Sequence, residues 1–115
     1  MKVSIIIPHW NGIETLSECI KSILKTQFDS YEIIVVDNAS TDGSQDWIKE
    51  EYSQIILIEN DKNYGYAGGC NRGVDYANGE FIIFLNNDTI QDPEWIKYLI
   101  NLAETNENIA AVQPK

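Results

Sequence analysis

Short apolar runs alternate along the chain with longer segments in which apolar residues recur every three or four positions. The short runs are rich in β-branched residues and predict β-strands, whereas the longer spacing is typical of amphipathic helices. Because the runs are almost uniformly apolar, we expect parallel strands that are covered on both faces. The predicted strands are Val3–Ile7, Glu32–Asp37, Ile55–Glu59, Glu80–Leu85 and Ile109–Val112.

Helices are predicted between and after these strands. Apolar residues keep helical spacing from Ile13 to Leu24. In "STDGSQDWIKEEY" the Ser, Thr and Asp are candidate N-caps of a second helix, and a third is expected from Tyr66 to Ala77. A fourth begins at Asp92-Pro93, where a cap residue precedes a first-turn proline. The alternation of strands and helices predicts an open α/β sheet with right-handed crossovers.

Length and charge narrow the possible partners. With 115 residues, of which 43% are hydrophobic, the chain is expected to form one domain with a packed core. The formal net charge of -10 argues against a nucleic-acid partner, since non-specific binders need a basic patch. A small anionic ligand remains compatible with an acidic protein, because backbone N–H groups or a metal ion can hold it.

Targeting and metal-ligand patterns are also informative. The opening "MKVSIIIPHW" is too short for a signal peptide, and no apolar run approaches the ~20 residues of a membrane span. Cys19 and Cys70 lack a paired metal-ligand spacing, so both thiols are expected to be structural. His9 is the only histidine, which excludes multi-histidine metal sites. We therefore expect a cytoplasmic protein.

Polar or glycine-rich segments follow each of the first four predicted strands. They read "PHWNG", "DNASTDG", "NDKNYGYAGG" and "NNDT". In open parallel sheets, ligands bind outside the carboxyl ends of the strands, near the point where the strand order reverses. We therefore expect these four segments to converge on one crevice, with Trp10 as a candidate wall for a nucleobase.

Two aspartates at strand ends each allow two interpretations. Asp37 could accept a hydrogen bond from the imide N–H of uracil or thymine, or it could form a turn before the next helix, which this stretch alone favours. Asp88 could hold Mg²⁺ or Mn²⁺, which prefer oxygen ligands and leave positions to phosphate and water. The alternative for Asp88 is a polar turn before Asp92.

The glycine-rich segment "NYGYAGGCNRG" is also open to two interpretations. Its glycines could let a helix N-terminus approach an anionic group, or they could serve tight packing of the helix on the sheet. It matches neither a Walker A loop nor a dinucleotide fingerprint. Asn71 within it is a candidate contact, because an amide is slightly unfavourable inside a helix unless it holds something.

Five segments together carry a family resemblance: "VSIIIPHWNG", "YEIIVVDNASTDGS", "NYGYAGGCNRG", "ANGEFIIFLNNDT" and "DPEWI". In this order and spacing they resemble the nucleotide-binding half of the inverting GT-A glycosyltransferases of family 2, especially the rhamnosyltransferase-like branch. The resemblance implies an open, mostly parallel Rossmann-like sheet with helices on both faces. It covers nearly the whole chain.

The resemblance also implies roles for individual residues. The base, the ribose and the diphosphate-sugar would be contacted by Pro8, His9, Trp10, Asn11, Asp37, Asn63, Gly65, Asn71 and Asn87. Asp88 would match the family's metal-binding aspartate, for Mg²⁺ or Mn²⁺. The family's Asp-X-Asp motif is reduced here to Asn86-Asn87-Asp88, and Cys70 replaces an asparagine common in the branch.

The family's second half carries the catalytic base and the acceptor site. The resemblance therefore implies that residues 1–115 form the N-terminal nucleotide-sugar-binding part and that the base lies beyond Lys115. The full-length enzyme would transfer a sugar, with inversion and metal assistance, from a UDP- or dTDP-sugar to a saccharide or lipid-linked acceptor. It would act in the cytoplasm or at the inner face of the membrane, any membrane contact coming from regions outside this sequence. The fragment alone is expected to be inactive.

Two other functions remain open at this point, and a third, a nucleotidyltransferase, is disfavoured because the glycine-rich, basic loop usual after its first strand is missing. One is a non-catalytic nucleotide-binding module. The other is a receiver-like signalling domain that binds Mg²⁺, although such domains place acidic residues after the first strand, where this chain has "PHWNG".

Overall fold

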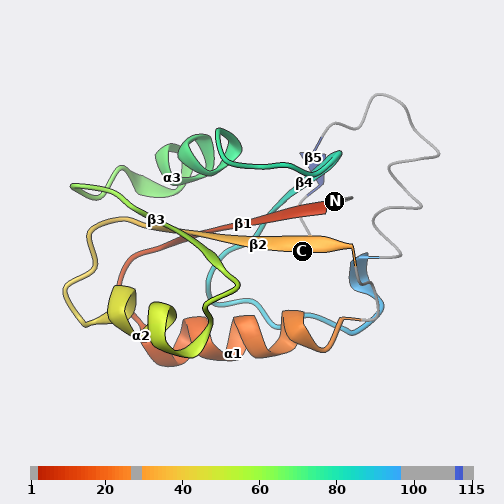
Figure 1. Ribbon diagram of the computed structural model, residues 1–115, viewed down its shortest axis with the longest axis horizontal. Coiled ribbons are helices and arrows are strands. Elements are labelled where there is room, and N and C mark those ends of the chain that lie inside the picture. Colours follow the sequence, from red (N-terminus) through yellow and green to blue (C-terminus); the bar gives the residue numbers. More distant parts are fainter. Residues whose placement is uncertain (1–2, 27–29, 97–110, 113–115) are drawn as a thin grey trace.

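The computed structural model describes residues 3–26, 30–96 and 111–112, which form an α/β fold around one parallel sheet (Figure 1). The sheet order is β3-β2-β1-β4-β5, and every strand pair in the described part of the chain is parallel. The predicted open sheet is therefore confirmed. In chain order the elements are β1 Val3–His9, α1 Ile13–Leu24, β2 Tyr31–Asp37, α2 Ser44–Glu51, β3 Ile56–Glu59, α3 Gly65–Val74, β4 Phe81–Phe84 and β5 Ala111–Val112.

Strand β1 is the centre of the sheet. It pairs with β2 along its whole length, from Val3 opposite Tyr31 to His9 opposite Asp37, and on its other side with β4. The chain thus moves outward from β1 to β3 and then crosses back to place β4 beside β1. The reversal lies between β1 and β4, which is where ligands bind in sheets of this kind.

Helices cover both faces of the sheet. Helices α1 and α2 lie on one face, and α3 lies on the other (Figure 1). Alternate residues of β1 serve the two layers, as the pleat requires: Ile5 and Ile7 belong to the larger apolar cluster with α1 and α2, whereas Ile6 belongs to the cluster on the opposite face. All seven residues of β1 are buried, so the expected coverage of both faces is confirmed.

Helix α3 packs on the sheet through glycines. A Cβ atom at Gly73 would lie 2.4 Å from Ile6 Cγ2, and one at Gly69 would lie 2.8 Å from Pro8 Cβ. No side chain fits at either position without movement of the strand below. Tight helix-to-sheet packing, one of the two interpretations of this segment, is therefore what these two glycines provide.

The N-terminus of α2 differs from the prediction. The N-cap of α2 is Gly43, with φ 86°, and not a Ser, Thr or Asp. A left-handed residue at this position favours glycine, and the Asp42 carboxylate just before it accepts the Ser44 N–H at 3.1 Å. The predicted side-chain cap at α2 was therefore wrong by one residue.

The third and fourth predicted helices were located but not fully delimited. Helix α3 begins one residue earlier and ends at Val74 rather than Ala77. The predicted fourth helix starts as expected, since Asp92 Oδ1 accepts the Glu94 N–H at 2.9 Å. From residue 97 onward this helix lies outside the described residues, and so do residues 109–110 of the predicted fifth strand. Within residues 3–26, 30–96 and 111–112, no helix has the length and apolar character needed to cross a membrane.

Candidate functional site

A cleft of about 260 Å³ opens at the carboxyl ends of the strands. All four predicted strand-end segments contribute to it, so their convergence on one crevice is confirmed. Six of its lining residues were predicted from the sequence and two, Asn38 and Tyr66, were not. The full set is Pro8, His9, Trp10, Asn38, Asn63, Gly65, Tyr66 and Asn87.

Two aromatic side chains, one from the loop after β1 and one from α3, give the cleft apolar surface. Trp10 follows β1 and is 52% exposed, and Tyr66 lies in the first turn of α3 and is 40% exposed. Burial, together with the nearby Cys70 thiol, raises the pKa of Tyr66 to about 12. The Tyr66 hydroxyl thus stays protonated at neutral pH. Exposed aromatic faces of this kind are suited to a planar base or a sugar ring.

His9 closes the inner end of the cleft. Its side chain is 1% exposed and bridges two segments: Nδ1 lies 2.9 Å from Asn87 Nδ2, and Nε2 lies 2.9 Å from Ser44 Oγ. Burial lowers the pKa of His9, and the carboxylates of Asp37 and Asp42 oppose that shift only in part. The ring is therefore neutral near pH 7, with one donor and one acceptor nitrogen.

Asn87 and Asp88 lie in the turn that follows β4. The turn is held by Thr89, whose hydroxyl donates to the Asn86 carbonyl at 2.9 Å. Asn87 lines the cleft, whereas Asp88 is exposed beside it. In the described part of the chain, no three His, Cys, Asp or Glu side chains gather as a metal site. A divalent ion here would have Asp88 as its one carboxylate ligand and would need other oxygens, such as those of a diphosphate.

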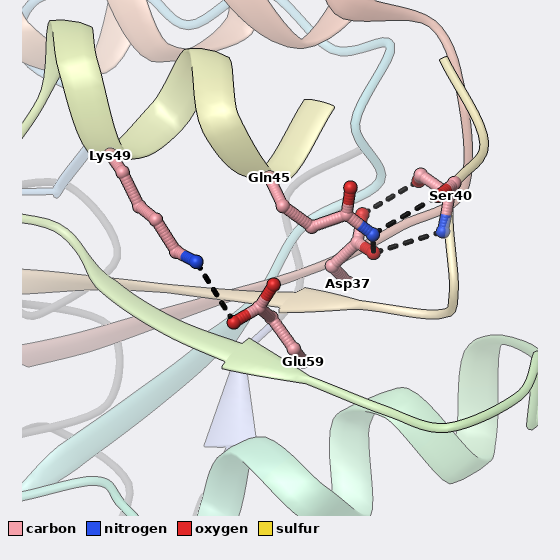
Figure 2. Close-up of polar contacts among 5 residues, drawn as sticks. All are labelled: Asp37, Ser40, Gln45, Lys49 and Glu59. Carbon is pink, nitrogen blue, oxygen red and sulfur yellow. Dashed lines mark hydrogen bonds and ion pairs between the residues drawn. The ribbon is translucent and has the colours of Figure 1, made fainter. Parts of the chain in front are cut away.

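The Asp37 side chain contacts Gln45 of α2 (Figure 2) and is not part of the cleft lining. Its carboxylate is 0% exposed and accepts the Ser40 N–H at 2.9 Å, the Ser40 hydroxyl at 2.6 Å and the Gln45 side-chain amide. Farther along the same helix, Lys49 pairs with Glu59 at 3.2 Å. The turn interpretation of Asp37 is thus what the structure shows, and a contact with a base stays a prediction.

Two further predicted residues also lie outside the cleft lining. Asn11 has a left-handed backbone with φ 52°, and it joins the loops after β1 and β2: its N–H donates to Ser40 Oγ and its Oδ1 accepts the Thr41 N–H, both at 2.8 Å. Asn71 is exposed on α3. Their roles toward a ligand stay predictions.

Asn38 is a cleft residue that the sequence analysis missed. It is 3% exposed, and its Oδ1 accepts from Asn60 Nδ2 at 2.9 Å and from the Tyr64 N–H at 3.4 Å, while its Nδ2 donates to the Gly65 carbonyl at 3.2 Å. Asn38 therefore fixes the loop that leads into α3. The alternation of side chains along a strand could have identified Asn38, because the residue after Asp37 must point to the opposite face of the sheet.

The model of the family described as Glycosyl transferase family 2 matches residues 4–115. The chain belongs to glycosyl transferase family 2. This membership confirms the resemblance at the level of the family and excludes the receiver-like domain. The rhamnosyltransferase-like branch stays a prediction.

Two curated relatives are similar to the chain. The chain is 34% identical over 114 residues to a poly(ribitol-phosphate) beta-glucosyltransferase of Bacillus spizizenii, covering 94% of the chain and 18% of the relative. It is 39% identical over 89 residues to the Escherichia coli UDP-Glc:alpha-D-GlcNAc-diphosphoundecaprenol beta-1,3-glucosyltransferase WfgD, covering 76% and 35%. The chain thus spans about a third or less of the length of these curated relatives.

A solved structure shows the same fold. Residues 1–349 of TarS from S. aureus superpose with a TM-score of 0.82 at 25% identity, covering 93% of this chain and 33% of that 1–349 chain. TarS has also been solved with UDP and with UDP-GlcNAc. The predicted GT-A type of sheet is therefore confirmed for this chain.

Proposed function

We propose that this chain binds the nucleoside-diphosphate-sugar donor of a family 2 glycosyltransferase, which transfers the sugar with inversion to a saccharide or lipid-linked acceptor. The observation that carries the proposal is the cleft at the switch point of the sheet, where the ends of four strands meet between Trp10 and Tyr66. Nucleotide complexes of TarS, which shares this fold, add support.

The donor would lie across the cleft from β1 toward α3. Trp10 and Pro8 offer apolar surface for the base and ribose. On the other side, Asn63 and Gly65 lead into the N-terminus of α3, whose first N–H groups and helix dipole favour an anionic diphosphate. Asn63 already holds this loop, since its Oδ1 accepts the Gly65 N–H at 2.8 Å.

Asp88 fits a role in holding Mg²⁺ or Mn²⁺. Its side chain is exposed and is adjacent in sequence to Asn87, which lines the cleft, and a carboxylate oxygen is a ligand that these ions prefer. A bound divalent ion would stabilise the negative charge that develops on the leaving nucleoside diphosphate. The contributions of the chain itself are to orient the donor and to provide hydrogen bonds at fixed positions.

The remaining parts of the reaction are proposed to lie outside this sequence. As the resemblance implies, the base that deprotonates the acceptor, and the acceptor site, would lie beyond Lys115. We therefore expect donor binding but no appreciable transfer by the 115-residue chain. A cytoplasmic location, where nucleotide-sugars are available, is part of the same proposal, and the choice between UDP- and dTDP-sugars is left to the binding experiment.

Calorimetric titration tests the proposal directly. UDP, dTDP and GDP would be titrated with and without Mn²⁺ into wild type, Asp88→Ala and Glu50→Ala, which removes an exposed carboxylate from α2 as a control. We expect metal-dependent binding of UDP or dTDP that Asp88→Ala weakens at least ~10-fold and Glu50→Ala leaves unchanged. Equal binding by wild type and Asp88→Ala would refute the metal role. No binding by a folded wild type would refute donor binding by this chain.

A further inference from the structure

A chain of hydrogen bonds runs from the cleft to the loop before α2, and His9 is its central member. The imidazole joins Asn87 on the turn after β4 to Ser44 at the start of α2. Ser44 is fully buried, and its hydroxyl donates in turn to the Asp42 carboxylate. The last link is the Gly12 N–H, which donates to Asp42 Oδ2 at 2.7 Å.

The direction of this chain is fixed at its Asp42 end. Burial alone would raise the pKa of Asp42, but hydrogen bonds from Ser44 and Gly12 hold it below its ordinary value, so the carboxylate is ionised and only accepts. Ser44 has a single hydroxyl proton, and that proton goes to Asp42. The Ser44 oxygen can therefore only accept from the imidazole, which requires the proton of His9 to be on Nε2.

The same assignment of hydrogen-bond donors and acceptors fixes the orientation of the Asn87 side-chain amide. A neutral imidazole protonated on Nε2 has a lone pair on Nδ1, and that atom can only accept. The Asn87 side chain must then turn its NH₂ group toward the ring, which matches the 2.9 Å contact of Nδ2 with Nδ1. The amide oxygen is thereby turned away from the imidazole and remains able to accept a hydrogen bond from a ligand in the cleft that Asn87 lines.

We propose that His9 is a positioning residue, which sets the orientation of the Asn87 amide so that its oxygen can accept from a hydroxyl group of the bound nucleoside diphosphate. This inference rests on the proposed function for the identity of the ligand. The orientation itself depends on four side chains of the ligand-free chain: Asp42, Ser44, His9 and Asn87. A His9 that merely filled space would require none of these directions.

The tautomer of His9 can be measured without any ligand. His9 is the only histidine, so a long-range ¹H–¹⁵N correlation spectrum shows one imidazole. At pH 7.5 we expect a neutral ring with Nε2 protonated and Nδ1 unprotonated. A ring protonated on Nδ1, or a charged ring, would overturn the proposal whatever the chain binds. This arm is therefore independent of the proposed function.

A second arm measures the consequence for binding. UDP with Mn²⁺ would be titrated into wild type, His9→Leu, His9→Gln, Asn87→Ala and the double variant His9→Leu/Asn87→Ala. Loss of one oriented hydrogen bond should weaken binding about three- to ten-fold in His9→Leu, and His9→Gln, which keeps one donor and one acceptor, should recover most of it. If His9 acts through Asn87, the double variant is no weaker than Asn87→Ala alone.

The outcomes separate the two proposals. Additive losses in the double variant would overturn the positioning role while leaving nucleotide binding intact. Failure of wild type to bind UDP would refute the proposed function and the ligand contact, and the tautomer would still decide whether His9 orients Asn87. If His9→Leu does not fold, Ser44→Ala replaces it. We expect Ser44→Ala to weaken UDP binding, although Ser44 does not line the cleft. Unchanged affinity for UDP in Ser44→Ala would overturn the proposal.

Discussion

Gly73→Ala tests the closest contact between α3 and the sheet. The added methyl carbon would lie 2.4 Å from Ile6 Cγ2 and 3.2 Å from Val36 Cγ2. Ordinary carbon contacts are about 3.5–4.0 Å, so the first is more than ~1 Å too short. Ile6 and Val36 are fully buried on adjacent central strands, which leaves them little room to move. The helix is therefore expected to lift from the sheet.

Two opposing effects set the magnitude of the change. Overpacking of a tight site costs about 1–3 kcal/mol, and the geometry at Gly73 favours the upper end. Alanine is a better helix former than glycine by about 1 kcal/mol, which offsets part of this. We expect a net loss of about 2 kcal/mol in the free energy of unfolding and a fall of roughly 10 °C in Tm.

Urea unfolding followed by circular dichroism would measure the effect of Gly73→Ala. Val74→Ala is the matched control, because Val74 is the next residue of α3 and is 39% exposed; its stability should equal or slightly exceed that of wild type. Nucleotide binding should also weaken in Gly73→Ala, since the N-terminus of α3 carries part of the cleft. If Gly73→Ala were as stable as wild type, the close approach of α3 to β1 would be refuted.

Three further changes probe the site. Trp10→Ala should weaken UDP binding by about 1–3 kcal/mol in calorimetry, the usual range for base stacking on an aromatic side chain, with little change in Tm because Trp10 is half exposed. Ser40→Ala removes one hydrogen bond from the buried Asp37 carboxylate and should cost about 1.5–3 kcal/mol of stability in urea; a loss below ~0.5 kcal/mol would contradict the geometry in Figure 2. Because burial lowers the pKa of His9, the folded state binds fewer protons than the unfolded state. The contribution of His9 to stability should therefore be complete above about pH 6.5 and fall below that pH by at most ~1.4 kcal/mol per pH unit. His9→Gln should lose this pH dependence in urea unfolding measured between pH 7.5 and 5.

The fold was largely predictable because its signal is repeated along the chain. Apolar runs without polar interruption appear only where strands are covered on both faces, and each strand end carries polar residues. The start of α2 was not predictable in the same way. Residue propensities favour Ser, Thr or Asp as the N-cap, but the left-handed backbone at Gly43 lets Asp42 hold the Ser44 N–H from one residue further out.

The cleft residues were harder to predict, because adjacent residues at a strand end point to opposite layers. His9 and Asp37 are register partners, so their side chains share the face that carries α2, and both contact residues that precede or begin that helix. Asn38 is one position out of phase with Asp37, so it points toward the start of α3 and into the cleft.

Right-handed crossovers supply only part of the missing step. Helices α1 and α2 connect strands in the outward direction and α3 connects them in the return direction, so they must lie on opposite faces. Sequence alternation then sorts the residues of β2 into two sets but does not say which set faces which layer. Only the packing does, since Ile34 and Val36 lie in the α3-side cluster and Ile33 and Val35 in the other. Asn38 continues the first set, so its amide points toward the start of α3 and reaches the cleft from that side.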